Sequence, residues 1–201
     1  MRVFWRPQKR YPYNMTLPSW HEEPIAKKHE RNDFDCGQPE LNAFLQKHAR
    51  QNHERGAAKT FLAIDDGDGK TVYGYYSLSP ASIEYARTPE IARRGLGRYD
   101  IGAYRLGRLA TCIDLQGQGL GGQLLLAAGR RCLRVAEEVG GTALLIDAKD
   151  ERAAVWYASY GALRLLDAPL SLLLPLDLVA AALNLKTAFN TENTEPQRAQ
   201  K

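Results

Sequence analysis

The feature that most constrains the fold is a glycine-rich turn between a predicted strand and a long predicted helix. Residues 106–113 (LGRLATCI) suit a strand, residues 116–122 (QGQGLGG) hold four glycines, and residues 123–139 have the apolar period of a helix. The backbone amides of such a turn and the dipole of the following helix favour an anion at one spot. We therefore expect residues 117–122 to bind a phosphate or pyrophosphate rather than to form a plain tight turn.

The remaining pattern alternates helices and strands, which is typical of an α/β protein. Asp66 to Gly69 separate two runs rich in β-branched and aromatic residues, and this arrangement predicts a β-hairpin. A short helix near Glu90 to Arg94 is expected inside a long linker, residues 80–102. The other predicted elements are a helix between Pro39 and Gly56, the hairpin strands 60–65 and 71–78, a strand at 143–147, a helix at 151–160, and strands near 163–166 and 170–176.

A single domain accounts for most of the 201 residues, because one core of this size buries enough surface to be stable. We place this domain at residues 25–180. Residues 1–24 are a basic arm interrupted by prolines, which we expect to be irregular. Residues 181–201 form a polar tail that we expect to be disordered.

Composition and spacing exclude several classes of protein. The longest apolar stretch, residues 170–185, is broken by Ser171, Pro175 and Asp177 and falls short of the roughly 18 uninterrupted apolar residues of a membrane span. No apolar core of a signal peptide is recognisable near the N-terminus, so we expect a cytoplasmic protein. Three widely spaced cysteines and four histidines without an i, i+4 pair predict neither a disulfide framework nor a metal site.

Basic residues cluster along the chain. The formal net charge is +4, and residues 1–28 and 87–108 each hold six lysines or arginines against two acidic residues. Clustered arginines bind polyanions such as RNA, because each neutralised phosphate releases counterions. A solvated surface without a partner gives the same pattern, so charge alone leaves both possibilities open.

The glycine turn also matches a dinucleotide-binding fingerprint. Gly117, Gly119 and Gly122 satisfy G-x-G-x-x-G, and Asp147 ends the next predicted strand, where a ribose-binding acid would lie. That fold needs several more parallel strand and helix units after the predicted strand that ends at Asp147. Because only about 50 residues follow and their end is polar, this alternative is disfavoured.

Two motifs in order carry a more specific resemblance. Residues 116–121 (QGQGLG) resemble the Q/R-x-x-G-x-G/A signature of the GNAT acetyltransferases, and residues 156–161 (WYASYG) resemble the aromatic motif that follows it in that family. Four further segments resemble the GNAT toxins of bacterial toxin–antitoxin modules: 34–41 (FDCGQPEL), 74–78 (GYYSL), 106–110 (LGRLA) and 147–151 (DAKDE). The resemblance covers roughly residues 25–178.

The resemblance implies both a fold and an activity. The fold would be the α/β (α+β) GNAT fold, with a mixed, mostly antiparallel central sheet flanked by helices. The activity would be transfer of acetyl from acetyl-CoA to the α-amino group of aminoacyl-tRNA, which blocks translation. A neutralising ribbon-helix-helix antitoxin and a homodimer are the partners it implies.

Site residues follow from the same resemblance. Tyr157 would be the general acid that donates to the departing sulfur of CoA. No general base is expected, because an α-amino group has a pKa near 8 against about 10.4 for lysine. The pantetheine would lie along a splayed strand and the pyrophosphate on the glycine turn. The residues expected to bind acetyl-CoA are Leu109, Ala110, Thr111, Gln116, Gly117, Gln118, Gly119, Leu120, Gly121 and Gly122.

For the RNA, the candidates are Arg93, Arg94 and Arg98, with Arg55 and Lys59 as weaker ones. Arg108 is expected either near the RNA or in a structural ion pair beside the site. Two alternatives for function remain open at this point. One is a GNAT enzyme acting on a small amine or a protein N-terminus, and the other is a regulatory module that binds acetyl-CoA without turnover.

Overall fold

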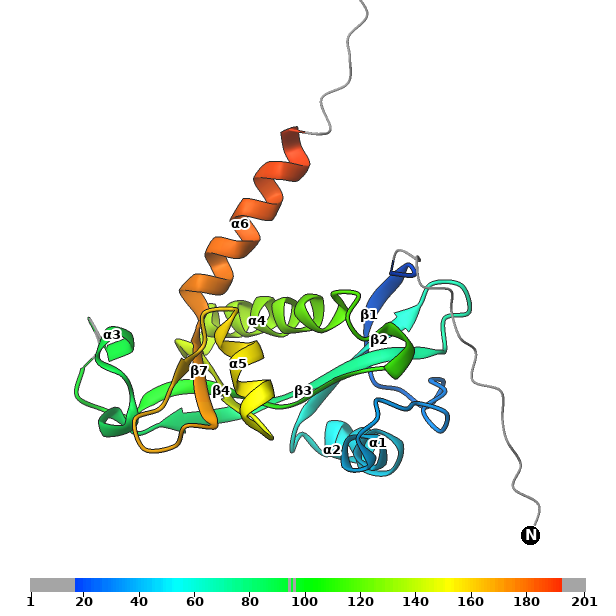
Figure 1. Ribbon diagram of the computed structural model, residues 1–201, viewed down its shortest axis with the longest axis horizontal. Helices are drawn as coiled ribbons and strands as arrows, with labels where there is room; N and C mark the ends of the chain where they lie inside the picture. The colour runs from blue at the N-terminus through cyan, green and yellow to red at the C-terminus, as the bar shows by residue number, and fades with distance from the viewer. Residues whose placement is uncertain (1–16, 94, 96, 193–201) are drawn as a thin grey trace, which may run out of the picture.

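The computed structural model describes residues 17–93, 95 and 97–192. Seven strands form one sheet in the order β1-β2-β3-β4-β5-β7-β6 (Figure 1). The strands are β1 (Trp20–Pro24), β2 (Lys59–Asp65), β3 (Val72–Ile83), β4 (Ile101–Thr111), β5 (Ala143–Asp147), β6 (Leu163–Arg164) and β7 (Ser171–Pro175). Only β4 and β5 pair in parallel, whereas the other neighbours are antiparallel. The predicted mixed, mostly antiparallel sheet is thus confirmed.

Helices cover both faces of the sheet. They are α1 (Pro39–Ala43), α2 (Ala49–Arg55), α3 (Glu90–Arg93), α4 (Leu120–Val139), α5 (Glu151–Ala158) and α6 (Leu176–Glu192), with a π-helical turn η1 (Phe44–His48) and short 3₁₀ turns η2 (Tyr85–Arg87) and η3 (Ile113–Leu115). Residues of α4 and α5 share one apolar core, and residues of α1, η1 and α2 share another on the opposite face (Figure 1). The helix predicted between Pro39 and Gly56 is confirmed, although it includes the π-helical turn.

Strands β3 and β4 are longer than the sequence predicts. The expected linker from residue 80 to 102 contributes Pro80 to β3, opposite Tyr104 of β4. β2 ends its pairing with β3 at Leu78, so beyond that point β3 has a neighbour on one side only. A proline is tolerated there because a strand without a second neighbour does not need every backbone N–H.

Segments near both ends of the described part form elements that the sequence did not predict. Residues 20–24, inside the predicted irregular arm, form β1 and pair antiparallel with β2. At the other end, α6 continues to Glu192, past the predicted end of the domain near residue 180. Its first turns pack on α4, where Gly129 faces Val179, and the helix then extends away from the body (Figure 1). Residues 1–16 and 193–201 lie outside the described part.

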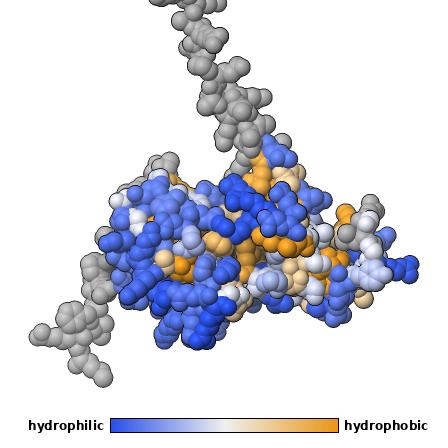
Figure 2. All heavy atoms as spheres, turned by 180° about the vertical axis from the view of Figure 1, so that it is seen from behind, coloured by the Kyte–Doolittle hydropathy of each residue, from blue (hydrophilic) through white to orange (hydrophobic). Residues whose placement is uncertain are grey.

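The surface is mostly hydrophilic. Figure 2 shows apolar side chains gathered in the middle of one face, close to where α6 leaves the body. In the described ranges, none of the helices has the length and apolar character needed to cross a bilayer.

Candidate active site

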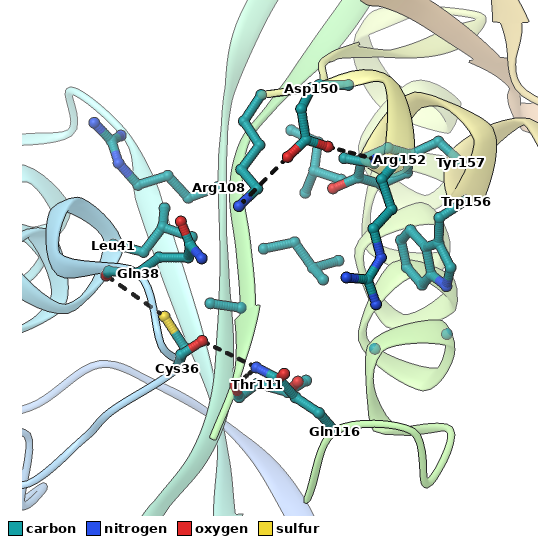
Figure 3. Close-up of a pocket in the computed structure, with 18 of the residues that line it drawn as sticks. Cys36, Gln38, Leu41, Arg108, Thr111, Gln116, Asp150, Arg152, Trp156 and Tyr157 are labelled. Carbon is teal, nitrogen blue, oxygen red and sulfur yellow. Dashed lines mark hydrogen bonds and ion pairs between the residues drawn. The ribbon is translucent and has the colours of Figure 1, made fainter. Parts of the chain in front are cut away.

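A cleft opens where β4 and β5 diverge. The two strands pair only from Ala103 to Leu106 of β4, and the rest of β4 keeps β3 as a neighbour on its other side. The cleft has a volume of about 790 Å³ and is lined by β4, the glycine turn, α5, and the loop that leads into α1. Figure 3 shows it with α5 on one side and the α1 segment on the other.

The last part of β4 forms the floor of the cleft. Leu109, Ala110 and Thr111, all predicted to bind the donor, line it together with Gly107. Because β5 pairs no further than Leu106, the β4 edge beyond that residue faces the cleft without a strand partner. Such an edge accepts an extended ligand as if it were an added strand.

The glycines of the turn fall into two structural classes. Gly117 and Gly119 have positive φ angles of 78° and 89°, and a Cβ at either position would meet no atom within 4 Å. They line the cleft at the N-terminus of α4. Positive φ favours glycine, and the open space beside these residues allows close approach of a ligand to the backbone. This geometry suits the predicted anion site.

Gly121 and Gly122 line the cleft as well, and they also face aromatic side chains of α5 and the turn after it. A Cβ on Gly122 would overlap Oη of Tyr160, and one on Gly121 would lie 3.4 Å from a ring carbon of Trp156, an ordinary contact. Leu120 is fully buried in the core and does not line the cleft. The sequence pattern alone could not show which of these residues line the cleft and which is buried.

The two glutamines of the turn direct their amide groups at backbone carbonyls. Nε2 of Gln116 donates to the carbonyl oxygens of Cys36, at 3.0 Å, and Thr111, at 3.2 Å. Nε2 of Gln118 donates to the carbonyl oxygen of Asp114 at 3.0 Å. Neither amide therefore has the orientation expected of a side chain that binds pyrophosphate.

Tyr157 lies on α5 and borders the cleft. The Asp150 carboxylate caps this helix by accepting a hydrogen bond from the Ala153 backbone N–H at 2.8 Å, as expected of an N-cap residue. Tyr157 is 9% exposed and contacts Trp156 edge to face, with ring centroids 4.8 Å apart. Burial raises the pKa of Tyr157 to about 12, so its hydroxyl stays protonated at neutral pH. Among the described residues, none hydrogen-bonds this hydroxyl.

Opposite α5, a second wall comes from residues 35–42, which we call the α1 wall. Cys36, Gln38, Glu40 and Leu41 line the cleft from this side, and Figure 3 shows Gln38 and Leu41 beside it. Sequence analysis used this segment only to establish the resemblance and assigned no site residue to it. The signal was present in the 34–41 motif, but nothing in the spacing showed that it faces the glycine turn.

The cleft also contains basic side chains. Arg108, which the sequence placed beside the site, lines it together with Lys149 and Arg152, which the sequence did not assign to it. The guanidinium of Arg108 lies 3.7 Å from the centroid of the Phe44 ring, a cation–π contact rather than the ion pair considered above. It is Arg105 that pairs with the Asp147 carboxylate.

The predicted RNA-binding arginines lie at the other end of β4. Arg93 and Arg98 border a separate hollow with Tyr85 and Glu90, and the Arg93 guanidinium lies 4.8 Å from the Tyr85 ring centroid. Arg94 lies outside the described residues. This hollow precedes Ile101, and the eight residues from Ile101 to Arg108 span roughly 23 Å of strand. The structure therefore does not bring these arginines into the cleft.

Comparison with known proteins decides the family. No protein-family model matches the chain. The chain is 32% identical over 136 residues to the tRNA-acetylating toxin of Mycobacterium tuberculosis, a match covering 68% of this chain and 80% of that protein. This chain belongs to the tRNA-acetylating toxins.

Solved structures of such toxins share the fold. AtaT complexed with acetyl-methionyl-tRNAfMet matches with a TM-score of 0.76 and 26% identity, over 82% of this chain and 99% of AtaT. An AtaT tyrosine-to-phenylalanine variant bound to acetyl-CoA and the C-terminus of the antitoxin AtaR matches with a TM-score of 0.70 and 26% identity, over 82% and 98%. The GNAT resemblance is therefore confirmed.

Membership of this toxin family agrees with the sheet topology and rules out the dinucleotide alternative. A dinucleotide-binding domain has a mostly parallel sheet, whereas here a single strand pair is parallel. Asp147, the candidate ribose ligand, is also occupied, because its carboxylate pairs with Arg105 and accepts a hydrogen bond from the Ser171 hydroxyl at 2.8 Å.

Proposed function

We propose that this protein is the toxin of a toxin–antitoxin module and transfers acetyl from acetyl-CoA to the α-amino group of aminoacyl-tRNA, which blocks translation. The observation that carries the proposal is a buried tyrosine bordering the β4–β5 cleft in a chain that belongs to the tRNA-acetylating toxins. The acetyl-methionyl-tRNA complex of AtaT supports an aminoacyl-tRNA as the acceptor.

The residues present fit acetyl-CoA. The unpaired edge of β4 at Leu109 to Thr111 offers backbone groups to the pantetheine, and the open positions beside Gly117 and Gly119 offer backbone amides to the pyrophosphate. When bound, acetyl-CoA supplies a thioester that an amine attacks. Gly121 and Gly122 line the same part of the cleft, and the buried Leu120 contributes by anchoring the start of α4 in the core.

Tyr157 acts as a hydrogen-bond donor to the leaving sulfur. Its pKa of about 12 lies above that of a thiol, near 8.5, by about 3.5 pH units. Proton transfer to the sulfur before the carbon–sulfur bond breaks is therefore unfavourable. A hydrogen bond that strengthens as negative charge develops on the sulfur is favourable, and it contributes only in the transition state.

The acceptor amine needs little help from a base. An α-amino group has a pKa near 8, so roughly a tenth to a quarter of it is neutral between about pH 7 and 7.5, and esterification to tRNA lowers this pKa further by withdrawing electrons. The cleft does contain the Glu40 carboxylate, on the α1 wall. We assign the acceptor to that side of the cleft, because the β4 edge and the glycine turn are used by the donor.

The basic groups divide between two regions in this proposal. Arg108 and Arg152 in the cleft lie near the reacting groups. Arg93 and Arg98, at the other end of β4, would bind RNA phosphates away from the acceptor end. A tRNA is large enough to contact both regions at once, and such binding would weaken as the salt concentration rises.

The partners follow from the relatives. One AtaT structure contains the C-terminus of its antitoxin, which supports an antitoxin for this protein as well. We propose that the antitoxin is of the ribbon-helix-helix type, that the toxin is a homodimer, and that it acts in the cytoplasm.

The experiment that tests this function measures transfer of labelled acetyl from acetyl-CoA to a mixed pool of charged tRNA. Uncharged tRNA and Tyr157→Phe serve as controls. Label that appears only on charged tRNA and falls with Tyr157→Phe supports the proposal. If acetyl-CoA binds but no tRNA is labelled, the proposal fails, and small amines and protein N-termini become the acceptors to test.

A further inference from the structure

We propose that Gln116 is a positioning residue that holds the α1 wall against the end of the donor strand β4. This inference rests on the proposed function, because it assigns the α1 wall to the acceptor and β4 to acetyl-CoA. It also changes the role expected for Gln116, from a ligand of the cofactor phosphates to a link between the two halves of the cleft.

The α1 wall is braced by hydrogen bonds between its own residues. Oδ1 of Asp35 accepts hydrogen bonds from the Gly37 backbone N–H at 2.8 Å and from Nδ2 of Asn42 at 2.7 Å. Oδ1 of Asn42 in turn accepts from the Cys36 backbone N–H at 2.9 Å. These contacts fix the shape of the loop, but they do not fix its distance from the glycine turn.

Three hydrogen bonds fasten the wall to the rest of the cleft, and each comes from a different segment. The Tyr75 hydroxyl of β3 donates to the Leu41 carbonyl oxygen at 2.9 Å, and the Ile113 backbone N–H donates to the Asp35 carbonyl oxygen at 2.9 Å. The third is Gln116, and it is the contact from the glycine turn to the Cys36 carbonyl. Because Gln116 lies in the glycine turn, its hydrogen bond joins the wall directly to the side of the cleft that binds acetyl-CoA.

The chemistry of the side chain explains why it cannot also bind phosphate. A carboxamide nitrogen carries two N–H donors. In Gln116 one is directed at Cys36 and the other at Thr111, the last residue of β4. A single amide therefore ties together the donor strand, the turn and the acceptor wall. The remaining carboxamide oxygen is an acceptor and does not stabilise an anion.

The test compares Gln116→Met with Gln46→Met. Methionine keeps much of the length of glutamine but has no N–H donor. Gln46 is a matched control, because its Nε2 also donates to two backbone carbonyls, those of Asn32 and Phe34, and it does not line the cleft. Three quantities are measured on the full-length protein: the Kd of acetyl-CoA, the KM for charged tRNA, and amide hydrogen exchange in residues 35–42.

For Gln116→Met we expect the KM for charged tRNA to rise about tenfold, because two hydrogen bonds of ordinary strength are lost. The Kd of acetyl-CoA should stay within about twofold, and exchange in residues 35–42 and at Ile113 should become faster. Gln46→Met should leave the KM and the Kd unchanged. Gln116→Arg restores N–H donors and should return the KM toward that of the wild type.

A higher Kd for acetyl-CoA with an unchanged KM for tRNA would overturn the inference and return Gln116 to the phosphate site. Unchanged exchange in residues 35–42 would overturn it as well. The exchange and Kd measurements need no acceptor. If the wild type acetylates no charged tRNA, the proposed function fails while these two measurements still decide the role of Gln116.

Discussion

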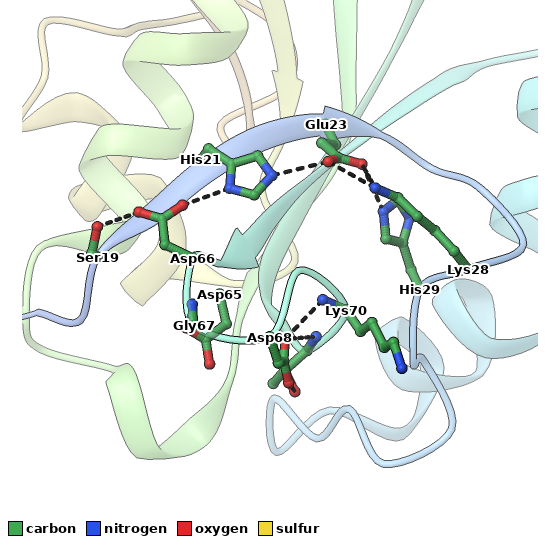
Figure 4. A network of polar contacts seen from close by, with 11 residues as sticks. Ser19, His21, Glu23, Lys28, His29, Asp65, Asp66, Gly67, Asp68 and Lys70 are labelled. Atoms are coloured by element: carbon green, nitrogen blue, oxygen red, sulfur yellow. Dashed lines mark hydrogen bonds and ion pairs between the residues drawn. The ribbon is translucent and has the colours of Figure 1, made fainter.

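The cleft and the N-terminal edge of the sheet use polar side chains in opposite ways. At the edge, Ser19, His21, Glu23, Lys28, His29 and Asp66 form a continuous series of hydrogen bonds and ion pairs that we call the edge network (Figure 4). In the cleft, the Tyr157 hydroxyl and the Glu40 carboxylate have no hydrogen-bond or ion-pair partner within the described ranges.

The difference separates stabilising groups from groups available to ligands. Polar side chains that stabilise a fold are satisfied by their neighbours, and each edge residue links β1 to a neighbouring turn. Polar groups that face a cleft without a partner remain free to bind substrate. Substitutions in the two regions should therefore differ: those in the cleft should change activity, and those in the edge network should change stability and its dependence on pH.

The largest expected effect is that of Tyr157→Phe. Removing the hydroxyl should lower the rate of acetyl transfer by about 100-fold or more, the usual contribution of a general acid. The Kd of acetyl-CoA should change little, because the hydroxyl acts in the transition state. Single-turnover transfer to charged tRNA and direct titration with acetyl-CoA measure the two quantities.

Thermal unfolding is the control for Tyr157→Phe. Because the hydroxyl has no described hydrogen-bond partner, its loss should leave the Tm close to that of the wild type. A large fall in Tm would mean that the hydroxyl stabilises the fold, and a rate within about threefold of the wild type would exclude it as the donor to sulfur.

The second effect concerns the packing beneath the cleft. Gly122→Ala places a Cβ against Oη of Tyr160, the far end of a side chain that is 44% exposed. The ring must shift, so the change should cost about 1 kcal/mol of unfolding free energy, the low end for overpacking. Gly121→Ala is the matched control, because its Cβ would lie 3.4 Å from the nearest atom of Trp156. Urea unfolding measures both variants.

Adding Tyr160→Phe to Gly122→Ala removes the closest atom, so the double variant should regain part of the lost stability. If the two changes are additive instead, the contact between Gly122 and Tyr160 is not the cause. The double variant would therefore show whether the approach of two helices, which sets the shape of the cleft, affects stability independently of the polar groups in the cleft.

How far the sequence predicted the site depends on how local each contact is. The strand, turn and helix around Gly117 and Gly119 were predictable, because their geometry is determined within about 30 consecutive residues and glycine marks the left-handed positions. The position of Tyr157 came from a motif of the same local kind. The sheet class was predicted from family resemblance and confirmed.

Contacts between distant segments were not predictable. Gln116 and Cys36 are 80 residues apart, and nothing in either motif shows that one amide joins them. β1 lies within the arm that prolines predicted to be irregular, and its five residues, WHEEP, include two glutamates. Its pairing with β2 and the edge network compensate for those charges. In both cases a tertiary interaction determined the outcome.

Within the edge network, His29 should make the fold less stable in acid. Its Nδ1 accepts a hydrogen bond from the Ala26 backbone N–H at 3.0 Å, so its Nε2 carries the proton shared with Glu23. Burial lowers the pKa of His29 in the folded state. Below pH about 6.5, the unfolded chain binds a proton that the folded chain resists, so stability falls as the pH falls.

The comparison with His29→Gln measures this contribution. Glutamine can accept from Ala26 and donate to Glu23 but does not titrate. Between pH 7.5 and pH 5 the wild type should lose about 1 kcal/mol more unfolding free energy than the variant, the cost of one broken hydrogen bond. Equal losses in both proteins would show that His29 is not the group responsible.

The smallest expected effect comes from His21, and its sign is opposite. Its two ring nitrogens face carboxylates, Nδ1 at 2.6 Å from Asp66 and Nε2 at 2.9 Å from Glu23. These hydrogen bonds, Glu23 first and then Asp66, raise the pKa of His21. Its contribution is complete below pH about 6.5 and is lost as the pH rises through the raised folded pKa.

Because His21 is exposed, salt should screen its contribution. His21→Gln should therefore destabilise the fold slightly at pH 6 and not at pH 9, and the difference should shrink in about 1 M salt. An NMR titration of the His21 ring should give a midpoint above about 6.5, and a midpoint at or below that value would contradict the paired arrangement. Two histidines bonded to the same Glu23 should thus have pKa values shifted in opposite directions. Burial lowers the pKa of His29, and the carboxylates on both sides of His21 raise its pKa.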